Sequence, residues 1–309
     1  MWGNFHKYWK LLGYQGYSIW LFTRSDFKTI VGPSTAFGIF NILAFSAYNL
    51  QPSDICFTHP FALLRLIAKI TFWVWINLLP FAIDNQLSPK AMSEDAVNKL
   101  WRTLPSKRMT PQQAGALRAP LYACAAITSW QLGGLRQCLS LLGLGIWYNH
   151  LGGSDTNAVI RNFINSAGYV CYTSGALEVA SGTRWLPEGV FPWFGLLGMV
   201  VFTTVQMQDF GDQAGDTIRD RKTLPLQIGD RPARCITAAL VPFWSCICAQ
   251  FWRLSVAKQT PVLILGCCIA YRLLSRISAE QDKTTFRVWN LWMVALYMMP
   301  LLYVSPKKI

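Results

Sequence analysis

Four aspartates with helical spacing form the stretch of this sequence best suited to chemistry. They follow the apolar run 191–205 at steps of three, four and four residues: Asp209, Asp212, Asp216 and Asp220. A helix turns by about 100° per residue, so this spacing predicts four carboxylates on one face. Such like charges repel unless a cation lies among them, and Mg²⁺ is typically held by a few carboxylates together with phosphate oxygens and water. The alternative is a solvated acidic helix end, but the position after an apolar segment favours the metal site.

A second polar stretch, residues 82–110, carries groups that could complete such a site. Asp95, Asn98 and Arg102 are spaced by three and four residues, which predicts a common face if they lie on a helix. The acid could then bind the cation while the guanidinium donates to phosphate oxygens. Asn85 stands at the end of the preceding apolar segment, and its amide oxygen is a further candidate metal ligand.

The two polar stretches share a short pattern. Each leaves an apolar segment through acidic or amide residues, passes a basic residue and reaches Thr-Leu-Pro, at 103–105 and at 223–225. This repetition suggests an internal duplication whose halves face one another. Lys222, just before the second Thr-Leu-Pro, is a candidate point charge for a diphosphate. The alternative is that Arg102 and Lys222 only anchor the chain at a membrane surface.

Composition places these loops in a membrane protein. Of the 309 residues, 52% are apolar and only 14% are charged, whereas about a quarter is charged in soluble domains. The net charge of +13 could indicate nucleic acid, but the basic residues gather in short segments between apolar runs, as in the cytosolic loops of membrane proteins. We therefore expect the lipid bilayer as a partner, no nucleic acid, and no obligate protein partner.

The expected fold is an all-α membrane protein with about nine transmembrane helices around a central cavity. Residues 1–28 read as an amphipathic, interfacial lead-in, and 29–309 as a single transmembrane domain. Only Gly133 and Gly134 divide the third apolar segment from the fourth, so eight spans is the main alternative. The nine segments that are long enough, or nearly long enough, to span are 29–50, 61–84, 113–131, 134–150, 159–180, 188–208, 232–252, 260–277 and 285–304. The basic loops after the second and sixth segments predict that these loops and the N-terminus face the cytosol.

The second polar stretch resembles a known motif. Asp209-x-x-Asp212-x-x-x-Asp216, followed by Arg221-Lys222-Thr-Leu-Pro, is similar to the second aspartate-rich motif of the UbiA superfamily of intramembrane prenyltransferases. That family is built of nine transmembrane helices, in agreement with the apolar segments.

The first polar stretch resembles the first motif of the same family, with a departure. The match runs through Asn85, Asp95, Asn98, Lys99, Arg102 and Leu-Pro-Ser at 104–106. Members that prenylate aromatic acids usually have Asn-Asp-x-x-Asp, but Gln86 follows Asn85 here and no acid comes before Glu94. This pattern with fewer acidic residues, and the lead-in 18–29, are similar to a fungal secondary-metabolite branch of the superfamily. That branch includes membrane-bound terpene cyclases as well as transferases.

The resemblance implies an activity and a set of site residues. The chain would ionise an allylic diphosphate, namely farnesyl diphosphate, and cyclise the resulting cation. The alternative within the family is a prenyltransferase that acts on an aromatic or polyketide acceptor. A third interpretation, from a different class of protein, is a transporter or a non-catalytic scaffold. The protein would be a multi-pass protein of the endoplasmic reticulum whose site opens to the cytosol. Mg²⁺ would be held by Asn85, Asp95, Asp209, Asp212 and Asp216. The three aspartates of the second motif, with Arg102 and Lys222, would be catalytic, and Asn98 and Lys99 would be cofactor-binding.

Aromatic and acidic residues inside the apolar segments complete the candidates. Aromatic faces can stabilise a carbocation, and the candidates are Trp73, Trp75, Tyr169, Tyr172, Trp193, Phe194 and Phe202. Glu178 lies at membrane depth, where an acid is either functional or paired with a nearby helix.

Overall fold

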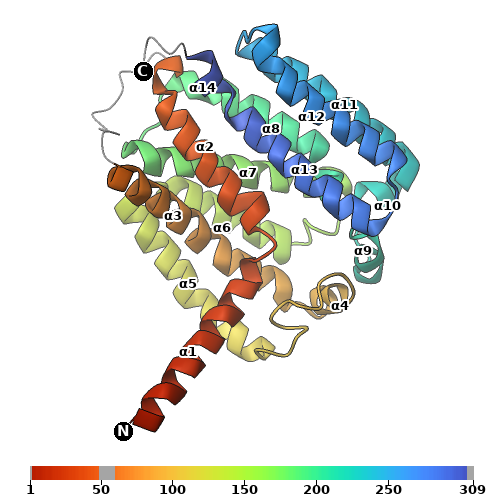
Figure 1. Ribbon diagram of the computed structural model, residues 1–309. Helices are drawn as coiled ribbons and strands as arrows, with labels where there is room; N and C mark the ends of the chain where they lie inside the picture. Colours follow the sequence, from red (N-terminus) through yellow and green to blue (C-terminus); the bar gives the residue numbers. More distant parts are fainter. Residues whose placement is uncertain (1, 49–59, 305–309) are drawn as a thin grey trace.

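The protein folds as a bundle of helices in the computed structural model, which describes residues 2–48 and 60–304. Figure 1 shows the long helices packed side by side, with the short helices α4, α9 and α10 together at one end of the bundle. The helices that lie in the predicted apolar segments are α2 (Gly32–Leu43), α3 (Pro60–Leu87), α5 (Pro111–Leu132), α6 (Leu135–Asn149), α7 (Ala158–Ser181), α8 (Phe191–Thr204), α11 (Asp230–Phe251), α12 (Val256–Ser275) and α13 (Ala279–Tyr297). The other α-helices are α1 (Trp2–Thr23), α4 (Pro89–Asn98), α9 (Gln213–Arg219), α10 (Leu224–Ile228) and α14 (Met299–Tyr303). The predicted all-α class is confirmed, and within the described residues each predicted segment contains one long helix; residues 49 and 50 of the first segment lie outside them.

Three helical stretches of the described chain are long and apolar enough to cross a membrane, judged by length and composition: Pro60–Leu87, Glu188–Gln208 and Asp230–Phe251. Helix α7 is of sufficient length but carries polar residues, among them Arg161 and Asn162, which are buried inside the bundle. Membrane proteins place such residues toward the bundle interior or a cavity. The lower hydropathy of α7 therefore reflects its inward face.

The break between α5 and α6 occurs at the two glycines that the sequence indicated. Gly133 and Gly134 have φ angles of 101° and 82°, a region that favours glycine. A Cβ atom at Gly134 would lie 2.5 Å from the ring of Trp73, so a side chain does not fit there. The alternative of eight spans, with one helix through this point, is wrong.

Glu178 pairs with this same junction. Its carboxylate accepts hydrogen bonds from the backbone N–H of Gly134 at 2.8 Å and from the side chain of Gln137 at 3.0 Å. A carboxylate at a helix N-terminus satisfies unpaired N–H groups and the helix dipole. Glu178 therefore caps α6, which matches the second of its two interpretations, pairing with a nearby helix.

Helix α1 extends away from the bundle in Figure 1, and its C-terminal half contacts the loop after α4, where Arg108 bonds to Tyr14. Tyr14 and Tyr17 are exposed, whereas Phe22 in the last turn is fully buried in a cluster with Leu79 and Ile83. The side chains of Trp2, Lys7 and Tyr8, part of the predicted interfacial lead-in, lie outside the described residues, and the interfacial location stays a prediction. A π-helical turn, η1 (Phe27–Val31), then joins α1 to α2.

Candidate active site

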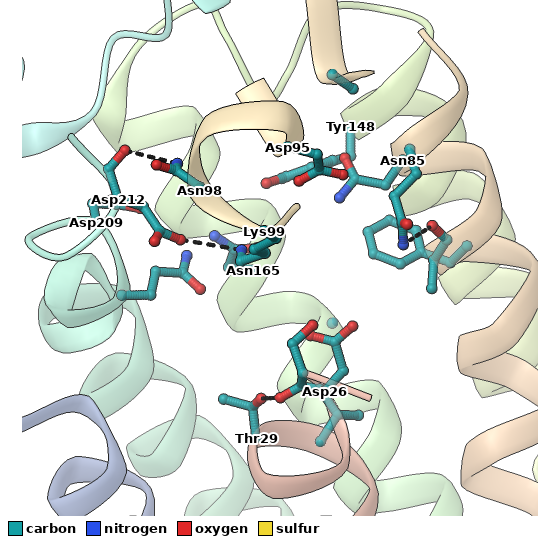
Figure 2. Close-up of a pocket in the computed structure, with 18 of the residues that line it drawn as sticks. Asp26, Thr29, Asn85, Asp95, Asn98, Lys99, Tyr148, Asn165, Asp209 and Asp212 are labelled. Atoms are coloured by element: carbon teal, nitrogen blue, oxygen red, sulfur yellow. Dashed lines mark hydrogen bonds and ion pairs between the residues drawn. The ribbon is translucent and has the colours of Figure 1, made fainter. Parts of the chain in front are cut away.

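A cavity of about 550 Å³ lies inside the bundle, as the sequence predicted. Its polar part, called the mouth below, is lined by α4, η1 and residues 208–221. Figure 2 shows Asp212 and Asn98 on one side of this part and Asn85 on the other, with Asp26 and Thr29 below them. Its apolar part is built by α3, α6, α7 and α13 and includes Leu78, Phe81, Leu144, Ile164 and Phe286. The cavity thus joins a charged region to a hydrocarbon-like one.

The second acidic loop does not continue α8 as one regular helix. A 3₁₀ turn, η4 (Val205–Gln208), follows α8, and α9 begins only after Asp212. The predicted single helical face of four aspartates is therefore wrong, because the phase of the helix changes between Asp209 and Asp216. Asp209, Asp212 and Asp216 nevertheless all line the cavity, whereas Asp220 is exposed and lies outside its lining.

The end of α9 decides which basic residue enters the mouth. Asp220 has a left-handed backbone with φ of 62°, which Asp tolerates better than most residues. The chain reverses there, and the N–H of Arg221 donates to the carbonyl of Asp216 at 2.9 Å. Arg221 is buried and lines the cavity, whereas Lys222 is exposed and does not. The structure places the predicted point charge, Lys222, outside the mouth, with Arg221 inside it.

The first polar loop turns back on itself. Helix α4 ends at Asn98, so Arg102 is not on the same helical turn as Asp95, contrary to the spacing argument. The guanidinium of Arg102 instead returns to donate to both carboxylate oxygens of Asp95, at 2.7 and 2.9 Å. The Asn98 side chain donates to the carbonyl of Asp212 at 3.0 Å, and Lys99 forms an ion pair of 3.1 Å with the Asp212 carboxylate (Figure 2).

These contacts join the two loops, which confirms that they face one another. Glu94 of α4 accepts from Arg219 at 3.1 Å and from Arg221 at 2.7 Å. Gly215 permits the close approach, because a Cβ atom there would lie 2.2 Å from the Asn98 amide nitrogen. The contact between α4 and α9 therefore leaves no room for a side chain at position 215.

Within the described part of the chain, four cavity-lining residues each have a buried side-chain oxygen without a hydrogen-bond partner. The four atoms are Oδ2 of Asp209, Oδ2 of Asp216, Oδ1 of Asn85 and Oε1 of Gln86. The other oxygen of Asp209 accepts from Arg161 at 2.7 Å, and that of Asp216 from Arg221 at 3.3 Å. A buried oxygen without a partner costs free energy, which a cation would offset.

The donors suit a hard cation that shares its shell with another ligand. Within the described residues, no group of three or more carboxylate, His or Cys side chains is assembled to hold a metal by itself. Mg²⁺ is commonly bound by one or two carboxylates with phosphate oxygens and water in the other positions. The unpartnered oxygens of Asp209, Asp216 and Asn85 fit that pattern, whereas both oxygens of Asp95 are already bonded to Arg102.

The carboxyl groups of the second loop differ in their charge. Burial raises the pKa of Asp216 to about 7, although the guanidinium groups of Arg161 and Arg221 oppose this. Burial also favours the neutral form of Asp212, but the ammonium group of Lys99 and its hydrogen bond outweigh it, so the pKa of Asp212 lies below its usual value. Asp212 is therefore the more fully charged carboxylate of the two.

Sequence reasoning missed several residues of the mouth. Arg161 pairs with Asp209, and Asn165, one turn further along α7, has an amide nitrogen that finds no partner among residues 2–48 and 60–304. A charge inside an apolar segment is a functional signal, and Arg161 in the segment 159–180 could have been found by it. Asp26, between α1 and η1, also lines the cavity, and burial raises its pKa against the opposing charges of Arg102 and Lys99.

Two of the seven aromatic candidates reach the cavity. Tyr169 and Tyr172 of α7 line it. Trp73 and Trp193 are fully buried in the main hydrophobic core, so their role is packing. Phe194 belongs to the same core, and Trp75 and Phe202 are not among the lining residues either. The lining aromatic residues that the sequence did not single out are Phe81, Trp101, Tyr148 and Phe286.

Comparison with known proteins agrees with this architecture. Residues 90–294 match the model of the UbiA prenyltransferase family. The chain belongs to that family. The fold is also shared: the chain superposes with a TM-score of 0.58 on a digeranylgeranylglyceryl phosphate synthase, at 17% identity and covering 91% of this chain and 96% of the other. A UbiA homologue from Archaeoglobus fulgidus, solved with GPP and Mg²⁺, gives a TM-score of 0.55 at 12% identity, covering 92% of this chain and 100% of the other.

Characterised relatives cover nearly the full length of the chain. The fumagillin beta-trans-bergamotene synthase of Aspergillus fumigatus is 26% identical over 92% of this chain and 91% of its own. The somaliensene A/B synthase of Streptomyces somaliensis is 27% identical over 92% of each chain, and a diterpene cyclase of Hericium erinaceus is 24% identical over 87% of this chain and 82% of its own. The UbiA protein described here is therefore an integral membrane enzyme of terpene cyclisation or prenyl transfer, which confirms the predicted resemblance and speaks against a transporter or scaffold.

Proposed function

We propose that this enzyme is a terpene cyclase that ionises farnesyl diphosphate with Mg²⁺ and cyclises the resulting cation. One observation carries the proposal: the cavity joins a mouth with unpartnered carboxylate oxygens to an apolar interior lined by aromatic rings. The names of the relatives, two terpene synthases and a diterpene cyclase, support the same class of reaction.

The mouth residues carry the ionisation step. Asp209, Asp216 and Asn85 would hold the cation, which when bound neutralises charge on the departing diphosphate. Arg161 and Arg221 are buried beside these acids, so their charges are held in place before the substrate arrives. Fixed cations placed where negative charge develops lower the barrier of such a step. Asp212 contributes a charged carboxylate held by Lys99.

The first loop supports that arrangement from outside. Asp95 and Arg102 satisfy each other, and Asn98 bonds to the backbone of the second loop. In this proposal Asn98 and Lys99 position the second loop, and Asp95 and Arg102 hold each other in place within the first loop. Lys222 has no part in it, because it lies outside the mouth.

The apolar part of the cavity favours cyclisation. Once the diphosphate leaves, the allylic cation lies among hydrocarbon side chains and the rings of Tyr169, Tyr172 and Phe81. Aromatic faces attract a desolvated cation, and a site closed to water protects it from hydrolysis. The double bonds of the prenyl chain itself are then the nearest nucleophiles.

The decisive experiment is an incubation without an acceptor. Microsomes or purified protein given farnesyl diphosphate and Mg²⁺ should release diphosphate and form a hydrocarbon that gas chromatography detects, and chelation of the metal should stop both. Product that forms only after addition of an aromatic or polyketide acceptor would instead establish the prenyltransferase.

We place the enzyme in the endoplasmic reticulum with its mouth toward the cytosol. The basic residues of the loops around α4 and α9 support this orientation, because positive loops remain on the cytosolic side. An epitope tag at the N-terminus should be removed by protease added to sealed microsomes. Protection of the tag until detergent is added would reverse the orientation.

A further inference from the structure

Three basic side chains on one side of the mouth have no ionic partner among the described residues. They are Lys28 of η1 and Lys283 and Arg287 of α13, and all three line the cavity. Of the other cations that line the cavity, Arg24 lies over the rings of Trp20 and Trp101. Each of the remaining ones contacts a carboxylate: Lys99, Arg102, Arg161, Arg219 and Arg221. We call Lys28, Lys283 and Arg287 the cationic rim.

The position of α13 is fixed by a buried ion pair beside the rim. Arg234 donates to both oxygens of Asp282, at 2.7 Å each, so the acid next to Lys283 is already neutralised. Lys283 and Arg287 are four residues apart and therefore share one face of α13. A Cβ atom at Gly211 would lie 3.0 Å from Cγ of Lys283, which places the stem of Lys283 directly against the second acidic loop. Glu280, one turn before Lys283, is not among the cavity-lining residues.

The rim concentrates positive charge near Asp26 and Asp212, although no ion pair joins these carboxylates to the rim among the described residues. Partial burial lowers the pKa of Lys28, the positive charges of Arg287 and Lys99 lower it further, and the two carboxylates oppose this by raising it. Like charges gathered in a concave region attract an anion and raise its local concentration. Lys28 also lies in the π-helical turn η1, and such turns are frequent at functional sites.

We propose that Lys28, Lys283 and Arg287 bind the diphosphate group of the substrate from the side of η1 and α13, next to Asp212. The site for the leaving group then has two parts: oxygens that hold a cation, and the cationic rim, which contacts phosphate oxygens without a metal. Only the allylic nature of the bound diphosphate rests on the proposed function; the binding of a diphosphate anion does not.

Binding of inorganic diphosphate to the purified protein in detergent, measured by calorimetry with and without Mg²⁺, tests the rim. Replacing one charge-assisted contact, as in Lys283→Ala or Arg287→Ala, should weaken binding about tenfold. The conservative variants Lys283→Arg and Arg287→Lys should stay close to the wild type. Arg276→Ala is the matched control, because Arg276 is an exposed cation just before α13 that does not line the cavity.

The outcomes separate the rim from the proposed function. Unchanged binding of diphosphate by Lys283→Ala and Arg287→Ala would overturn the proposal that the rim binds diphosphate, even if farnesyl diphosphate is cyclised. Weakened binding in these variants, together with no turnover of any allylic diphosphate by the wild type, would support the rim and overturn the cyclase.

A second feature, in the apolar wall, rests on a different observation. Gly168 of α7 lines the cavity, and a Cβ atom there would meet nothing within 4 Å. It stands between Ile164 and Tyr172, which line the same wall. The space beside Gly168 is therefore part of the cavity and is kept open by the absence of a side chain.

The structure assigns to Gly168 the control of how long a prenyl chain the cavity accepts, an inference that rests on the proposed function. A methyl group at this position would occupy substrate space without displacing protein atoms. Alanine also favours a helix over glycine by about 1 kcal/mol, so the variant should fold.

Diphosphate release from allylic diphosphates of ten, fifteen and twenty carbons tests this assignment. Gly168→Ala and Gly168→Leu should lose the longest substrate first, and Gly168→Leu should keep the ten-carbon substrate while losing at least about tenfold on the fifteen-carbon one. Gly195→Leu is the control, because Gly195 is an exposed glycine of α8 with equally open space and lies outside the cavity. Relative rates like those of the wild type would overturn the assignment, whereas a wild type that releases diphosphate from none of the three would overturn the proposed function.

Discussion

The two acidic loops of the mouth use their carboxylates in different ways. In the first loop, Asp95 is bonded to Arg102 through both oxygens, and Glu94 is shared by two arginines. In the second loop, Asp209 and Asp216 each keep one buried oxygen without a partner. Acids that look alike in the sequence thus divide into a structural set and a set free to bind a ligand. The division predicts which variants lose stability and which lose activity.

The largest effect is expected from breaking the closed pair of the first loop. Asp95→Asn leaves the guanidinium of Arg102, which is buried, without its counter-charge, and loss of one partner of such a pair typically costs about 3–5 kcal/mol. Thermal unfolding in detergent should show this loss.

Removal of both charges is the control for that prediction. The pair of substitutions Asp95→Leu and Arg102→Met should recover most of the stability, because an apolar replacement of a buried ion pair is often neutral. If Asp95→Asn alone were as stable as the wild type, the ion pair of the first loop would not be structural, and the distinction between the two loops would fail.

The second loop should show the opposite response. Asp216→Asn removes the negative charge of the carboxylate whose Oδ2 has no partner among the described residues. We expect diphosphate release to fall about 10²–10³-fold, as for the loss of one group that stabilises developing charge. Stability should change little, because burial already raises the pKa of this carboxyl group to about 7 and an amide oxygen can still accept from Arg221.

Asp220→Asn provides the matched control in the same loop, since Asp220 is exposed outside the cavity. Its rate should equal that of the wild type. Normal turnover by Asp216→Asn would remove the distinction between the loops.

A smaller effect should follow from forcing the two loops apart. Gly215→Ala places a methyl group against the amide of Asn98, and such overpacking costs about 1–3 kcal/mol. Unfolding temperature and diphosphate release should both fall. Gly115→Ala, on α5 where a Cβ atom meets nothing within 4 Å, should leave both unchanged or slightly raise stability.

The smallest effect is expected at Lys222. Lys222→Ala should leave turnover unchanged, because this side chain is exposed and outside the mouth, whereas Arg221→Ala should reduce it by removing a cation buried beside Asp216. Equal losses in the two variants, measured as diphosphate release, would show that the turn at Asp220 does not separate their roles.

Composition and apolar segments were sufficient to predict the class of fold. Long apolar runs must become helices in a bilayer because their backbone groups have no other partners there, so the nine segments could be located without a structure. The break at Gly133 and Gly134 was also visible in the sequence, because two adjacent glycines rarely continue a helix. The motif around Asp209 also indicated the family, because its residues lie close together along the chain and their spacing can be read without a structure.

Only the tertiary structure decided which of these residues meet in the mouth. Spacing along a chain predicts a common face only for an unbroken helix, and the 3₁₀ turn before Asp209 and the left-handed residue Asp220 both change the phase. That change puts Arg221 inside and Lys222 outside. The pairing of Arg161 with Asp209, and the free charges of the cationic rim, depend on packing between helices that are far apart in the sequence. The sequence determined the types of group available, and the packing determined which of them were left unpaired for a substrate.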